Sequence, residues 1–259
     1  MSTTTTTTGP DGLVRRPPAL DRHAFGSALR WLAFASSWVW LGFVLFAVGI
    51  TRSNVSTVGV TESVVGSLSI TPRNFLFAFA ITVLAVWFVP HVASGRTRRA
   101  LVTASAAAVS VAAAGYAVLL TVAFQVERPV YEANGWPLVI RTGHVFGSGD
   151  QVGLVLLESF VIAAAVGFAG LAVAAGYRRF GGVRGTLALA FTATPMLAAS
   201  ALLELRASAG IGEALGVDGL SAPVTLVAIA ALGAVSLATA YRLVHGAPAS
   251  RLSAAGGER

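Results

Sequence analysis

The sequence predicts an all-helical protein that crosses a membrane six times, with both termini in the cytoplasm. Of its 259 residues, 55% are hydrophobic and only 11% are charged, whereas soluble domains carry about 25% charged residues. The apolar residues are gathered into runs long enough to span about 30 Å of hydrocarbon at about 1.5 Å per residue. We therefore expect one polytopic membrane domain, residues 31–245, and no soluble domain.

The residues before the first apolar run predict two short segments. Residues 1–18 hold a threonine run and two proline-containing pairs, which predicts a disordered cytoplasmic tail. In residues 19–30, apolar side chains recur at roughly helical spacing, and Asp21 is a candidate N-cap. Two interpretations stay open for this second segment: an amphipathic helix lying on the membrane surface, or an extension of the first span into water.

Six spans follow, and proline marks two of them. Pro90 is expected to close the second span, and Pro195 is expected to kink the fifth. Residues 246–259 predict a flexible cytoplasmic tail. The predicted spans are residues 31–50, 74–92, 100–126, 152–177, 186–205 and 222–244.

The loop between the third and fourth spans contains one turn signal. Asn134-Gly135 lies between two stretches that could pair as strands, which suggests a small hairpin. Pro137 shortly afterwards weakens that interpretation.

The orientation follows from the basic residues, all 18 of which are arginine. With a cytoplasmic N-terminus, 13 arginines lie inside and five outside, as the positive-inside rule requires. The inner set is Arg15, Arg16, Arg22, Arg30, Arg96, Arg98, Arg99, Arg178, Arg179, Arg184, Arg242, Arg251 and Arg259; the outer set is Arg52, Arg73, Arg128, Arg141 and Arg206.

Missing residue types exclude several chemistries. Without lysine the chain cannot form a phosphate-binding P-loop or a lysine Schiff base. Without cysteine it cannot use a thiol nucleophile, a disulfide or a cysteine-ligated metal. The four histidines are far apart, so we expect no metal site and no cofactor. No catalytic residue is predicted, and we expect the chain not to be an enzyme.

Two arginine-rich turns on the cytoplasmic side are the candidate functional features. The first, Gly95-Arg96-Thr97-Arg98-Arg99, combines a glycine suited to a sharp turn, a threonine suited to cap the next helix, and three guanidinium groups. The second contains Arg178, Arg179 and Arg184. Two interpretations stay open: the arginines set topology and bind anionic lipid, or they dock a cytoplasmic protein.

These motifs resemble those of the permease subunit of type-2 ABC exporters of actinobacteria. The likeness lies in a tryptophan cluster in the first span, in His91-Val92-Ala93-Ser94-Gly95-Arg96-Thr97-Arg98-Arg99, and in Tyr177-Arg178-Arg179-Phe180-Gly181. In that family, the loop after the second span contacts a separate ATP-binding subunit. The resemblance therefore implies coupling roles for Gly95, Arg96, Thr97, Arg98 and Arg99, and less directly for Arg178 and Arg179.

The resemblance also implies the partners and the place of the protein. It implies a multi-pass protein of the cell membrane, a cytoplasmic ABC ATPase partner that hydrolyses ATP, and a dimer with itself or with a second permease. Membrane lipids complete the expected partners, and no nucleic acid is expected. The alternative function is a membrane scaffold or accessory protein that does not transport.

Glu158 is the candidate for a translocation path. It lies about six residues into the fourth span, where an ionised carboxylate costs several kcal/mol unless it faces other helices or water. The other interpretation places it near the outer interface, paired with an arginine such as Arg128 or Arg141. A third function, an intramembrane enzyme using Glu158, would need a second convergent polar residue.

Overall fold

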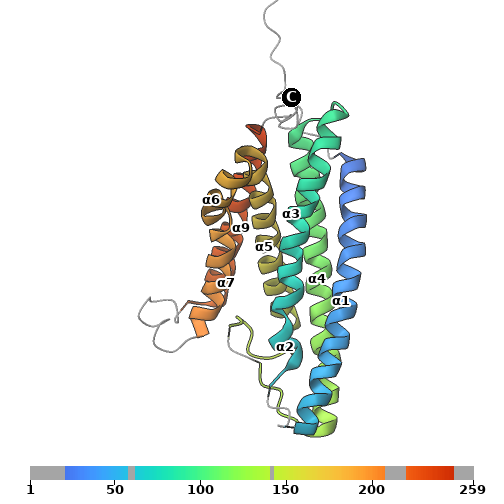
Figure 1. The fold of residues 1–259 in the computed structure, drawn as a ribbon. Coiled ribbons are helices and arrows are strands. Elements are labelled where there is room, and N and C mark those ends of the chain that lie inside the picture. Colours follow the sequence, from blue (N-terminus) through green and yellow to red (C-terminus); the bar gives the residue numbers. More distant parts are fainter. Residues whose placement is uncertain (1–20, 58–61, 141–142, 208–219, 248–259) are drawn as a thin grey trace, which may run out of the picture.

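The computed structural model describes residues 21–57, 62–140, 143–207 and 220–247, and every regular element in these residues is a helix. Six helical segments are long and apolar enough to cross a membrane, which confirms the predicted all-helical, six-span fold of a multi-pass membrane protein. The helices, shown in Figure 1, are α1 Arg22–Thr57, α2 Val64–Leu68, α3 Ile70–Ala93, α4 Arg98–Asn134, α5 Val152–Phe180, α6 Gly182–Thr192, α7 Thr194–Ala207 and α9 Ala222–His245.

Helix α1 is one continuous helix from Arg22, so residues 22–30 extend the first span. Asp21 caps it, because its Oδ1 accepts hydrogen bonds from the backbone N–H groups of His23 (3.1 Å) and Ala24 (3.2 Å). The predicted cap is therefore confirmed. The predicted tail at 1–18, and residues 248–259 of the C-terminal tail, lie outside the described residues.

The second span consists of two helices. Ser63 begins α2 with a side-chain oxygen that accepts from Gly66 N–H, and Ser69 joins α2 to α3. Helix α3 continues through Pro90 to Ala93, slightly beyond the predicted closure. Proline here does not end the helix, and the N–H of Ser94 still finds the Pro90 carbonyl at 3.1 Å.

The predicted hairpin at Asn134-Gly135 is wrong, because α4 runs past residue 126 to Asn134. Gly135 adopts the left-handed conformation (φ 66°) and ends the helix, and Trp136 N–H reaches back to the Tyr131 carbonyl at 3.0 Å. The rings of Tyr131 and Trp136 meet edge to face at 5.5 Å. This is a Schellman ending. Asn-Gly is a turn signal because glycine tolerates positive φ, and a helix C-terminus uses the same property.

Helix α5 lies at the centre of the bundle, and α3, α4 and α9 pack around it. Its small residues allow this, since a Cβ on Gly170 would lie inside van der Waals contact with the Phe77 carbonyl oxygen and 3.0 Å from Ala80 Cβ. On the other side, a Cβ on Gly233 of α9 would lie 3.0 Å from Ala165 Cα. Backbones approach this closely only where one side chain is absent.

The fifth span is broken in two, as Pro195 predicted. Helix α6 ends at Thr192, and α7 begins at Thr194. The hydroxyl of Thr192 donates to the Ala188 carbonyl, one turn earlier in α6, at 3.1 Å.

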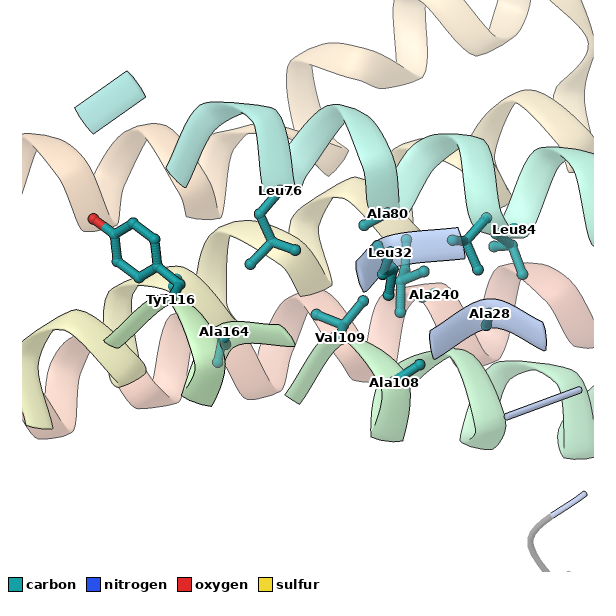
Figure 2. Packing of buried hydrophobic residues seen from close by; sticks show 14 of the residues in the cluster. Ala28, Leu32, Leu76, Ala80, Leu84, Ala108, Val109, Tyr116, Ala164 and Ala240 are labelled. Carbon is teal, nitrogen blue, oxygen red and sulfur yellow. The ribbon is translucent and has the colours of Figure 1, made fainter. Parts of the chain in front are cut away.

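The main core joins the five long helices α1, α3, α4, α5 and α9 around small side chains (Figure 2). Leu76, Ala80 and Leu84 of α3 face Val109 of α4, with Ala164 of α5 and Leu32 of α1 close by; all are buried. Large leucines from one helix fill the space beside alanines on its neighbours, so the helices pack closely.

Candidate functional site

The first basic turn joins α3 to α4 through local geometry that the sequence predicted. Gly95 has φ of +76°, which only glycine adopts without strain. Thr97 caps α4, since its side-chain oxygen accepts from Ala100 N–H at 3.2 Å. His91 Nε2 lies 3.2 Å from the Thr97 carbonyl oxygen and connects the end of α3 to the start of α4.

Arg96 ties this turn to the start of α1. One of its terminal nitrogens, Nη1, lies 2.8 Å from both carboxylate oxygens of Asp21, and His91 Nδ1 lies 4.0 Å from the same carboxylate. Burial would raise the pKa of Asp21, but the Ala24 N–H hydrogen bond and the Arg96 charge outweigh it, so its pKa lies below the ordinary value of 3.8. Asp21 thus both caps α1 and holds the first basic turn.

Arg98 and Arg99 tie the same turn to the end of α9. Arg98 Nη1 donates to the His245 carbonyl at 3.2 Å, and the Arg99 guanidinium lies 5.6 Å from the centre of the Tyr241 ring. The last carbonyls of a helix lack partners within it and carry the negative end of its dipole. An arginine from another helix satisfies that need.

The second basic turn reaches α9 as well. Arg179 Nη1 donates to the Arg242 carbonyl at 3.4 Å, and Arg178 donates to the Ala85 carbonyl and lies over the Phe88 ring of α3. Gly246 lies directly against the Arg179 guanidinium, so a Cβ there would displace this side chain.

The structure therefore brings the two predicted basic turns together around the last turn of α9. Both ends of the described chain lie there, since Asp21 contacts Arg96 and His245 contacts Arg98. Among the described residues, Asp21 is the acidic side chain of this end, and the others lie toward the opposite end of the bundle. We call this surface, formed by the two basic turns and the last turn of α9, the basic end. The sequence does not indicate that both basic turns contact α9, because no local pattern links residues about 150 positions apart.

Glu158 lies near the opposite end of α5 and is only 2% exposed. One carboxylate oxygen accepts from Val145 N–H at 2.6 Å, and the other lies 2.7 Å from His144 Nδ1. Arg128, one of the two expected partners, instead pairs with Glu132 and Asp150, and Arg141 lies outside the described residues. Glu158 fastens the loop before α5 to the bundle, and its role in a translocation path stays a prediction.

Glu127 makes a second buried contact at this opposite end. Its carboxylate accepts from the Ser63 hydroxyl at 2.6 Å and from Val65 N–H at 3.0 Å. It thereby supplies negative charge at the first turn of α2. In the sequence, Glu127 only marked the expected end of a span, since the buried start of α2 was not predicted.

No protein-family model, curated protein or solved structure matches this chain.

Proposed function

We propose that this protein is the membrane-spanning permease subunit of an ATP-driven ABC exporter in the cell membrane. A separate cytoplasmic ATPase would bind at the basic end. ATP chemistry on that partner is consistent with the absence of lysine from this chain. The assembly would contain a second permease, either another copy or a sister subunit.

The observation that carries this proposal is the connection of the first basic turn to four spans. The turn itself joins α3 to α4, Arg96 connects it to α1, and Arg98 connects it to α9. A partner that moves this turn would therefore act directly on α1, α3, α4 and α9. A coupling element needs this property, whereas a topology signal needs only positive charge.

The exposed charges of the basic end suit a carboxylate-bearing partner. The Arg96 side chain remains 40% exposed although it pairs with Asp21, and Arg99 is also exposed. Guanidinium groups bind carboxylates in two-point geometry, which favours a protein partner with acidic side chains.

Co-purification tests the proposal directly. The tagged protein, extracted from its native host in mild detergent, should recover an ATPase that carries a nucleotide-binding P-loop. Recovery without any ATPase, under conditions that preserve other transporter complexes, would favour the alternative of a non-transporting scaffold.

Charge reversal tests the docking role of the turn. Arg98→Glu with Arg99→Glu should uncouple ATP hydrolysis from transport and leave membrane insertion intact. Both arginines contact α9, Arg98 through its hydrogen bond to the His245 carbonyl and Arg99 through the Tyr241 ring. Because Arg99 is the more exposed of the two, Arg99→Glu alone is the sharper variant, and it should lose most of the recovered ATPase. Arg52→Glu is the matched control, since Arg52 is exposed and lies in the part of α1 far from the basic end. Equal loss with Arg52→Glu, or no loss with Arg99→Glu, would remove the docking role.

A further inference from the structure

A polar cavity of about 270 Å³ lies at the end of the bundle opposite the basic end. Its lining residues come from α2, α3, α7 and the loop before α5, and Figure 1 shows these segments at the same end of the bundle. Its polar lining comes from Arg73, Glu204, His144 and the serines Ser67, Ser69 and Ser200. The proposed transport function makes no use of it.

Arg73 is the unexplained group in this cavity. Its side chain is 9% exposed, and its Nε is buried with no hydrogen-bond partner among the described residues. The ion pairs found in those residues do not include Arg73 either. Buried charges in proteins are almost always paired, because removing a charge from water is costly. An arginine held this way within a span indicates a site for an anion.

Glu204 places the opposite charge in the same cavity. Its carboxylate lies against Gly143, where a Cβ would come within 3.1 Å of Oε2, and the φ of +108° at Gly143 favours glycine at this point of the loop. Glu204 and Arg73 form no ion pair with each other within 4.0 Å. Two opposite charges that share a cavity without neutralising each other match a ligand that carries both charges itself.

The size and lining of the cavity restrict the ligand further. A volume of about 270 Å³ is slightly below the usual range for drug-sized ligands, about 300–1,000 Å³. The hydroxyls of Ser67 and Ser69 already donate to the carbonyls of Ser63 and Gly66, at 3.0 and 2.8 Å, so they offer a ligand acceptor lone pairs. A small zwitterion fits, whereas a large apolar substrate does not.

We propose that this cavity binds a small zwitterion, with Arg73 against its carboxylate or phosphate and Glu204 against its ammonium group. Two sources supply this chemistry: a free amino acid, or the ethanolamine headgroup of a phospholipid.

Isothermal titration calorimetry of the purified full chain in non-ionic detergent tests the site. The probes are L-alanine and glycerophosphoethanolamine, with glycerol phosphate and ethanolamine as probes that carry one of the two charges. We expect one zwitterion to bind with a Kd of about 1 mM or tighter, and each single-charge probe about tenfold more weakly. Binding of alanine indicates a free amino acid as the source, and binding of glycerophosphoethanolamine alone indicates a headgroup.

Variants at both charges assign the binding to this cavity. Arg73→Gln and Glu204→Gln should each lower the affinity for the zwitterion by about tenfold or more, since each removes a charge-assisted contact. Arg52→Gln and Glu132→Gln, exposed outside the cavity, should leave affinity unchanged. If Arg73→Gln does not fold, the affinity of Glu204→Gln tests the proposal. Glu204 is exposed, so its replacement leaves no buried group without a partner. Binding of neither zwitterion, equal binding of a single-charge probe, or unchanged affinity in Glu204→Gln would overturn the proposal.

Discussion

Asp21 performs two tasks that can be separated by substitution. Its carboxylate caps α1 and pairs with Arg96, and asparagine retains the capping oxygen while removing the charge. The ion pair that joins the first basic turn to the start of α1 therefore depends on this one side chain.

Asp21→Asn should lower the free energy of unfolding by at most about 1 kcal/mol, the usual value of an exposed ion pair. Asp21→Ala should lower it by about 1 kcal/mol more, because the helix cap is lost as well. The pKa of Asp21 is lowered in the folded protein, so its ionised form adds stability above pH 3.8 that is lost as pH falls further. The gap between wild type and Asp21→Asn should therefore be constant near neutral pH and close below about pH 3.8. Thermal unfolding followed by tryptophan fluorescence measures it, and a gap that persists in acid would contradict the ion pair.

Glu158 is expected to matter more to stability than Asp21, because it is buried. Glu158→Ala leaves Val145 N–H without an acceptor, which costs about 1–3 kcal/mol. The melting temperature should fall by about 4–8 °C for a loss near 2 kcal/mol. The melting temperature of Glu158→Gln should fall less, because glutamine keeps an oxygen that can accept from Val145 N–H. Equal melting temperatures for wild type and Glu158→Ala would show that this hydrogen bond contributes little.

Among the elements, α5 depends most on the absence of side chains. Gly170→Ala should destabilise the protein by about 1–3 kcal/mol, because the added methyl group meets the α3 backbone at Phe77. Gly115→Ala in α4 is the matched control, since a Cβ there meets nothing within 4 Å, and it should be neutral or stabilise by up to about 1 kcal/mol. The melting temperatures of the two variants test this prediction. The same change in both would contradict the close packing of α5 on α3 as its cause.

The elements also show which features local sequence predicts. Asp21 and Thr97 were recognisable as caps because capping acts within three residues, and Pro195 was recognisable as a break because proline acts on its own turn. The end of α4 was not, since Asn134-Gly135 serves a hairpin or a helix ending equally well. Packing of Trp136 on Tyr131 distinguishes the two.

At the scale of the whole molecule, the charge asymmetry predicts the orientation in the membrane. The basic end should face the cytoplasm, with both termini inside. A fluorescent protein fused after His245 should fluoresce, whereas alkaline phosphatase should be active when inserted after Gly149 and inactive after His245. The reverse pattern would place the basic end outside and remove the proposed ATPase contact.

The sequence by itself determined the helical class, the six spans, the two basic turns and the caps. Each depends on residues close together in the chain, through run length, charge or turn chemistry. The tertiary structure decided that both basic turns meet on α9, that Glu158 pairs with His144, and that Arg73 and Glu204 share a cavity. These contacts depend on which helices lie side by side, and α5 sets that arrangement through close backbone packing that no local pattern encodes.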